Sequence, residues 1–291
     1  MEKKLLFLLV IFAITGCEII NPEEPIPAYI YVESFDLVTD PATEGSNSSN
    51  ITDVWLFSDG DFLGVYPLPA TIPILKSGMT NLRLRAGIKE NGIAATPDYY
   101  PFYAPYDLAI DLREARVDTI RPVIEYLDET KFSFIESFDG GGHLFSEIRV
   151  GDIENKITLT TADVFEGTKS ALIQLDTSHN IVELATGLSF DDLTETGKKV
   201  YLELNYKTEV PVLFGLIGFD NTNAAGEGLY GNGVNASSEW KKIYFNLTAA
   251  AVTDNFDFFK VGIRSSIPKE DGKFKLENAK IYLDNIKLLH F

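Results

Sequence analysis

The sequence is poor in the residues that build disulfide frameworks and metal centres. Its 291 residues include one cysteine, Cys17, and three histidines. A single thiol excludes an internal disulfide framework and any multi-thiolate metal site, and the scattered histidines do not suggest a histidine-based centre. Basic residues are also scarce, with 25 Lys and Arg against 43 Asp and Glu and a net charge of −18. Because so acidic a chain repels phosphate backbones, we exclude nucleic acid as a partner.

The chain also lacks the short motifs of common enzyme active sites. It contains no Gly-x-Ser-x-Gly, no His-Glu-x-x-His and no phosphate-cradling Gly-rich loop. Carboxylate pairs such as Asp191-Asp192 act only when the two carboxyl groups lie at a suitable separation, which depends on the fold. We therefore expect a non-catalytic protein.

The N-terminus carries an export signal. Leu5–Ile14 is an unbroken apolar run behind two lysines, and its ten residues are too few to span roughly 30 Å of hydrocarbon. The run leads into Ile-Thr-Gly-Cys, ending at Cys17, which resembles the lipobox of bacterial lipoproteins. The resemblance implies a signal peptide over residues 1–16, cleavage before Cys17, and acylation of Cys17 as a membrane anchor.

Residues 17–28 are the lipidated cysteine and a tether. The stretch is acidic and contains three prolines, which favour an extended backbone. Acidic residues just after the lipid resemble the export signal of lipoproteins displayed on the outer surface in bacteria with starch-utilisation-type systems. We therefore expect a lipid-anchored protein of the outer membrane, exposed at the cell surface. A periplasm-facing anchor with a plain acidic spacer is the alternative.

Beyond the tether, no long segment has the 3.6-residue periodicity of a helix. Short runs rich in Val, Ile, Phe and Tyr alternate with Gly, Asn, Asp and Pro, a pattern typical of all-β sandwiches. The length suggests about two domains. We predict an all-β protein with two β-sandwich domains, residues 29–127 and residues 128–291.

In the first domain, residues 54–57 and 62–66 flank an Asp59-Gly60 pair that tolerates the positive φ of a tight hairpin turn. The hairpin and the domain size resemble small immunoglobulin-like or transthyretin-like sandwiches. Further along, Asp118-Thr119-Ile120 resembles the O-glycosylation site of some Gram-negative envelope proteins, which would modify Thr119. The alternative is that Thr119 is an ordinary strand residue.

The second domain has about nine candidate strands, which fits a jelly roll. In residues 200–206 and 241–247 apolar side chains alternate with polar ones, so one face of each strand should meet the core. Four motifs occur in order: Phe138-Asp139, Phe165–Leu172, Glu239–Ile243 and Ile281–Ile286. Together they resemble the galactose-binding-like jelly roll of many carbohydrate-binding modules.

Two oddities lie in the first and last strands of this domain. Ile281 and Leu283 have the opposite parity to Ile286 and Leu288, which predicts a bulge at Asp284-Asn285. In the first strand, Glu136 falls on an apolar stripe, where a carboxylate is costly unless it is paired.

The family resemblance implies a structural Ca²⁺ near the sandwich edge. Its ligands would be Glu136 or Asp139, the backbone carbonyls from Gly167 to Lys169, and Asp284, a set of hard oxygen atoms that suits this ion. The alternative is a solvated Glu136 at a strand end and an Asp284 that caps a turn.

Four tyrosines are candidates for ligand binding. Tyr201, Tyr244 and Tyr282 have outward parity on three strands and could form a sugar platform, or else half-buried cross-strand aromatic pairs. Tyr230 lies in the Gly- and Asn-rich stretch 220–235, which we interpret as a loop that binds a ligand or simply connects two strands. We expect Trp240 to be structural, because the resembled family packs a tryptophan in this context.

Two functions fit these features. The first is an accessory interaction subunit of an envelope or outer-membrane protein assembly, held by its lipid. The alternative is a surface glycan-binding lipoprotein of a polysaccharide-utilisation system. The first ranks higher on sequence alone, because few rings are expected to be exposed.

Overall fold

The computed structural model describes residues 24–95, 97–191, 193, 198–220, 223–252 and 256–291. The expected signal peptide, Cys17 and most of the tether lie outside this range. Almost every described element is a β-strand, so the all-β prediction is confirmed. No helix in the described ranges is long and apolar enough to cross a membrane.

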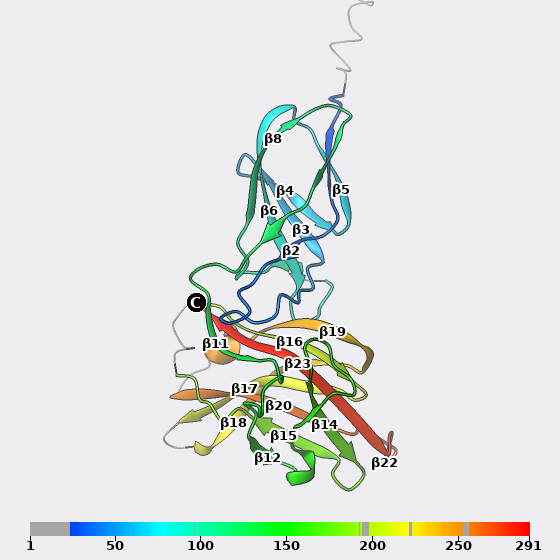
Figure 1. Cartoon of the computed structure of the whole chain (residues 1–291), viewed down its shortest axis with the longest axis vertical. Helices are drawn as coiled ribbons and strands as arrows, with labels where there is room; N and C mark the ends of the chain where they lie inside the picture. The colour runs from blue at the N-terminus through cyan, green and yellow to red at the C-terminus, as the bar shows by residue number, and fades with distance from the viewer. Residues whose placement is uncertain (1–23, 96, 192, 194–197, 221–222, 253–255) are drawn as a thin grey trace, which may run out of the picture.

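The N-terminal sandwich has two main sheets (Figure 1). Its strands are β1 (Ala28–Val32), β2 (Asp36–Leu37), β3 (Asp53–Ser58), β4 (Asp61–Pro67), β5 (Ala70–Ile74), β6 (Gly78–Lys89), β7 (Pro97–Tyr99), β8 (Tyr106–Leu112), β9 (Val117–Ile120) and β10 (Val123–Ile124). One sheet has the order β5-β1-β9. The other, which we call the hairpin sheet, has the order β4-β3-β6-β7 with β8 also paired to β6. The predicted hairpin joins β3 to β4, with Asp59 and Gly60 both at positive φ.

The C-terminal sandwich is a jelly roll of two larger sheets. Its strands are β11 (Lys131–Glu136), β12 (Glu147–Val150), β13 (Thr158–Thr160), β14 (Ser170–Asp176), β15 (Ile181–Ala185), β16 (Val200–Thr208), β17 (Val212–Asp220), β18 (Asn223–Val234), β19 (Ser237–Asn246), β20 (Phe258–Ser266), β21 (Lys269–Glu270), β22 (Lys273–Phe274) and β23 (Asn278–His290). The inner sheet has the order β13-β14-β23-β16-β19, with β11 also on β23. The outer sheet has the order β12-β15-β20-β17-β18.

The space between the inner and outer sheets holds the main core of the chain. Val200, Leu202 and Leu204 of β16 and Phe245 of β19 point into it, as the alternation predicts. The predicted loop over residues 220–235 is wrong, because most of that stretch is strand β18, paired antiparallel with β17. The many glycines and asparagines suggested a loop. In the structure, the glycines instead allow the neighbouring strand to approach closely.

The bulge predicted in the last strand is confirmed. Glu203 pairs with Lys287 and Asn205 pairs with Asp284, so β23 has one more residue than β16 between these pairs. Asn285 takes up the extra length at a φ of 47°. The bulge lets both ends of β23 direct apolar side chains into the core.

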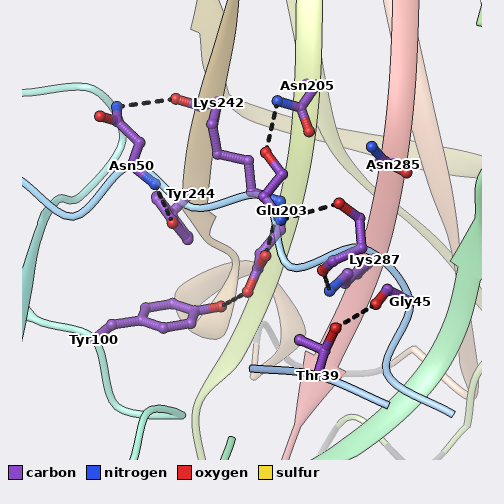
Figure 2. Close-up of polar contacts among 12 residues, drawn as sticks. Thr39, Gly45, Asn50, Tyr100, Glu203, Asn205, Lys242, Tyr244, Asn285 and Lys287 are labelled. Atoms are coloured by element: carbon purple, nitrogen blue, oxygen red, sulfur yellow. Dashed lines mark hydrogen bonds and ion pairs between the residues drawn. The ribbon is translucent and has the colours of Figure 1, made fainter. Parts of the chain in front are cut away.

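The inner sheet packs its second face against the N-terminal sandwich. Tyr201, Tyr244 and Leu289 belong to the same apolar cluster as the N-terminal core. Between the two sandwiches lies a buried polar group centred on Glu203 (Figure 2). Glu203 accepts a hydrogen bond of 2.7 Å from Tyr100 Oη and forms an ion pair of 2.9 Å with Lys242. The two sandwiches are therefore joined by apolar packing and by charge.

Candidate functional site

The outward side of the outer sheet carries aromatic rings and charged side chains, which occupy every second residue of its strands. Along β20, Phe259, Val261 and Ile263 point into the core, which turns Lys260 and Arg264 outward. Figure 1 shows this sheet on the side of the jelly roll away from the N-terminal sandwich. We call it the outer-sheet face. Its side chains are Glu147, Arg149, Glu183, Phe219, Tyr230, Phe258, Lys260 and Arg264.

Charges on the outer-sheet face are paired across strands. Glu183, buried on β15, accepts a hydrogen bond of 2.8 Å from Arg149 Nε and forms an ion pair of 3.4 Å with Arg264. Lys260 forms an ion pair with Glu147. These partners hold the charged side chains in place without neutralising their remaining hydrogen-bonding capacity.

The rings of the face lie beside these charges. Phe219 and Phe258 stack with centroids 5.0 Å apart and planes at 8°. The guanidinium of Arg149 lies 5.5 Å from the Phe219 centroid and the ammonium of Lys260 lies 5.6 Å from it. Such cation–π contacts fix the long side chains over the ring.

Tyr230 completes the face from β18. Burial first, and the charge of Glu183 second, raise the pKa of Tyr230, so its hydroxyl stays protonated at neutral pH. That hydroxyl is buried and has no hydrogen bond within the described part of the chain. A Cβ on Gly262 of β20 would collide with Tyr230 Oη, so the Tyr230 ring can take this position only because residue 262 is a glycine. The face thus combines flat apolar rings with oriented donors and acceptors, the chemistry that recognises polyhydroxylated ligands.

The residues expected to bind calcium are only partly brought together. Asp139 Oδ1 accepts hydrogen bonds from the backbone N–H of Thr168 at 2.6 Å and of Lys169 at 3.1 Å, so Asp139 does meet the Gly167–Lys169 loop. The loop directs N–H groups at the carboxylate, whereas the expectation was carbonyl groups. The alternative of a solvated Glu136 is wrong, because this side chain is buried.

Glu136 and Asp284 have separate roles in the structure. Glu136 accepts hydrogen bonds from the backbone N–H of Phe138 at 2.8 Å and of Leu144 at 2.7 Å. Asp284 accepts from the N–H of Glu166 at 3.2 Å, and burial, with the nearby charge of Asp139, raises its pKa to about 7. Within the described ranges, no three His, Cys, Asp or Glu side chains form a group that could hold a metal. Calcium at Asp139 and Asp284 stays a prediction.

The expected tyrosine platform does not exist on the inner sheet. Tyr201 and Tyr244 are each 1% exposed, because the N-terminal sandwich covers that face. Tyr282 is half-buried, with its ring centroid 6.3 Å from that of Trp240. Trp240 is also half-buried and donates a hydrogen bond of 2.8 Å from Nε1 to Asp163, an arrangement consistent with a structural role.

Thr119 is an exposed residue of β9, paired in parallel with Tyr31 of β1. The strand-residue interpretation is therefore confirmed, and O-glycosylation of this hydroxyl stays a prediction.

Sequence reasoning missed most of the outer-sheet face. Only Tyr230 was a candidate. The signal for the rest is the alternation of Phe258, Lys260 and Arg264 with the core residues of β20. That signal does not tell a binding face from an ordinary solvated one, because the pairing of Arg149 with Glu183 depends on strand order.

No family model matches this chain, and no curated protein matches it either. Among solved structures, the chain is similar to the CBM22-1 xylan-binding domain of Paenibacillus barcinonensis Xyn10C, with 16% identity over 54% of this chain and 93% of that one and a TM-score of 0.37. It is similar to a CBM61 module in complex with β-1,4-galactotriose, with 14% identity over 53% and 93% of the two chains and a TM-score of 0.33. A structure of carbohydrate-binding modules from the β-sandwich superfamily matches with 14% identity over 92% and 99% and a TM-score of 0.38.

Proposed function

We propose that this chain is a non-catalytic glycan-binding protein and that the outer-sheet face binds the sugar. The observation that carries the proposal is the set of paired charges beside stacked rings on a sheet face that the N-terminal sandwich leaves uncovered. This is the second of the two functions considered from the sequence. The interaction-subunit hypothesis ranked first there because few rings were expected to be exposed. The outer-sheet face gathers three rings beside its charged groups, with Phe258 and Tyr230 half-buried and Phe219 7% exposed.

The composition of the face favours a neutral sugar. Arg149, Arg264 and Lys260 each have a carboxylate partner, so the face offers hydrogen-bond donors and acceptors more than net charge. Sugar hydroxyl groups can both donate and accept, and the pyranose ring presents C–H groups to an aromatic ring. The guanidinium of Arg264, whose side chain is 45% exposed, can donate to a sugar oxygen, whereas the Tyr230 hydroxyl is buried beside Gly262.

The position of the face suits a surface-anchored protein. The first described residues lie at the end of the N-terminal sandwich farthest from the jelly roll (Figure 1). If Cys17 carries the lipid, as the sequence predicts, the N-terminal sandwich spaces the outer-sheet face away from the membrane.

The test is affinity electrophoresis of the full mature chain in gels that contain neutral polysaccharides such as xylan, galactan and glucomannan. We expect retardation of the wild type in at least one gel and binding about 3- to 10-fold weaker for Arg264→Ala, the loss of one hydrogen bond worth about 1 kcal/mol. Arg149→Ala should weaken binding further. Arg113→Ala, which removes the same side chain from an exposed pair with Asp111, is the matched control.

Two results would overturn the proposal. One is a wild-type protein that no neutral polysaccharide retards. The other is retardation that Arg264→Ala and Arg149→Ala leave unchanged while both variants remain folded by circular dichroism.

A further inference from the structure

A second aromatic face lies on the N-terminal sandwich. In the hairpin sheet, Val54 and Leu56 of β3 are buried, which turns Trp55 and Phe57 outward. Trp55 pairs with Arg85 of β6, and Phe57 pairs with Arg83. The outward side of the hairpin sheet therefore places two rings opposite two arginines, where a solvated sheet would carry small polar residues.

The rings of this hairpin-sheet face form a continuous surface. Phe62 of β4 lies 5.5 Å from Trp55 and 5.2 Å from Phe57 between ring centroids. Tyr99 of β7 meets Trp55 edge-on at 5.6 Å. Phe62 is 52% exposed. Exposed aromatic clusters of this kind mark binding surfaces more often than isolated exposed rings do.

Arg85 differs from two other cations of this face, Arg83 and Lys76. Arg83 forms two hydrogen bonds with Asp107, of 2.7 and 2.9 Å, and Lys76 forms an ion pair of 3.0 Å with Asp59. Arg85 has no carboxylate partner in the described ranges. Its guanidinium lies 3.7 Å from the centroid of Tyr99. In a chain with 43 acidic residues, a cation stacked on a ring without a counter-ion is a place for an anionic ligand.

A shallow groove runs along the two arginines and Phe57. Its volume is about 770 Å³, and its charged and polar lining residues are Asp59, Asn81, Arg83, Arg85 and Asp107, with Phe57 beside them. The volume falls in the range of small-ligand sites, about 300–1,000 Å³. The groove therefore offers a ring, an amide and an unpaired cation within one site, and its two carboxylates are already paired, Asp59 with Lys76 and Asp107 with Arg83.

We propose that the hairpin-sheet face binds a carboxylate-bearing saccharide, such as a uronate unit of an acidic polysaccharide. The carboxylate pairs with the guanidinium of Arg85, which presents two N–H groups in the geometry that carboxylates match. The sugar ring packs on Phe57 and Phe62, which an acidic peptide side chain would leave uncovered. This site is separate from the outer-sheet face and differs from it in having an unpaired cation.

The experiment is affinity electrophoresis of the full mature chain in gels that contain polygalacturonate or alginate. We expect retardation of the wild type, and binding about 10- to 100-fold weaker for Arg85→Gln, because a charged hydrogen bond is lost. Phe62→Ala should also weaken binding. Because the Phe62 ring is exposed, this variant tests the site without changing the packing around Arg85. Arg121→Gln, an exposed arginine of the same domain, is the matched control and should bind as the wild type does.

A poly-L-glutamate competitor distinguishes a sugar site from a site for acidic peptides. Galacturonate oligosaccharides should displace the polymer and poly-L-glutamate should not. Arg264→Ala, a variant of the outer-sheet face, should leave acidic-polysaccharide binding intact, so this test can fail while the outer-sheet proposal stands. Equal displacement by poly-L-glutamate, or no retardation of the wild type by either acidic polymer, would overturn the inference.

Discussion

Glu203 is a fully buried carboxylate whose two oxygens have different partners. Oε1 accepts hydrogen bonds from Tyr100 and Tyr126, of 2.7 and 3.0 Å, and Oε2 forms the ion pair with Lys242. Burial alone would raise the pKa of Glu203, but the charges of Lys242 and Lys287 outweigh burial and lower it. The carboxylate is therefore ionised, and its stability in the interior depends on those two lysines.

We expect Glu203→Ala to cost about 3–5 kcal/mol of unfolding free energy, because it leaves Lys242 as a buried charge without its partner. Urea unfolding followed by fluorescence measures the change. Glu239→Ala is the control, since that side chain is exposed, and should stay within about 0.5 kcal/mol of the wild type. A cost below about 1 kcal/mol for Glu203→Ala would mean that the buried polar group around Glu203 contributes little to the interface between the two sandwiches.

Lys287 predicts a pH dependence. Burial lowers its pKa to about 8, from 10.5. Between these values the unfolded chain binds more protons than the folded one, so stability should rise with pH. The expected rise between pH 8 and 9.5 is about 1–2 kcal/mol. Above pH 10 the buried tyrosines, whose pKa values burial raises, act in the opposite direction.

The measurement is urea unfolding of the wild type and of Lys287→Met at pH 7.5, 8.5 and 9.5. The methionine variant should lack the rise, because it has no group that titrates there. The same slope in both proteins would show that Lys287 is not responsible.

At the scale of elements, β16 and β19 are buried on both faces although their sequences alternate as if one face met water. The second face packs on the N-terminal sandwich through Tyr201 and Tyr244. Tyr244 Oη accepts a hydrogen bond of 2.8 Å from the backbone N–H of Asn50, and Tyr201 donates a hydrogen bond to Glu90. These tyrosines contribute packing and polar contacts to the interface between the two sandwiches.

Tyr244→Ala should therefore destabilise the protein by about 3–5 kcal/mol, as truncation of a buried aromatic ring does. Tyr282→Ala, on the same sheet but half-buried, should cost about 1 kcal/mol. Chemical denaturation compares the two. Similar small costs would contradict the buried position of Tyr244.

The bulge of β23 places Asp284 beside Asp139 and the Gly167–Lys169 loop, which makes the calcium prediction testable at this element. A cation there would offset the charge of two neighbouring carboxylates. If calcium binds, a chelator should lower the melting temperature of the wild type by several degrees, because a ligand of the native state is lost. Asp284→Ala should remove that sensitivity. Unchanged melting in chelator, on protein shown to be free of metal, would leave the backbone N–H groups and the Thr168 hydroxyl as the partners of these carboxylates.

At the scale of the whole molecule, the two sandwiches share one apolar cluster and one buried ionic group. The cluster of the N-terminal core includes Tyr201, Tyr244 and Leu289 from the jelly roll. Lys287 of the jelly roll donates a hydrogen bond of 2.6 Å to the carbonyl oxygen of Ser46 in the N-terminal sandwich. The outer-sheet face and the hairpin-sheet face are thus held on two sandwiches that pack on each other, which fixes the spacing between the two proposed sugar sites.

Anchoring is the prediction that belongs to this scale. Cys17→Ser should leave an uncleaved or soluble form, because the lipid is the expected attachment to the membrane. Palmitate labelling and membrane fractionation of cells that express the two proteins measure the change. Labelling that survives the substitution would show that Cys17 is not the acylated residue.

Local patterns in the sequence were enough for the all-β class, the hairpin at Asp59-Gly60 and the bulge at Asp284-Asn285. Each depends on side-chain alternation or backbone conformation over a few neighbouring residues. The inward positions of Val200, Leu202 and Leu204 follow from the same alternation.

The tertiary structure alone decided what covers each outward face. Alternation shows which side chains share a face, but whether that face meets water, another sheet or a ligand depends on contacts between distant residues. Tyr201 and Tyr244 were expected on an exposed platform. They are buried instead, because Tyr100 and Asn50, which contact them, come from the other sandwich. The outer-sheet face was missed for the same reason, since Arg149 and Glu183 meet only when β12 and β15 pair.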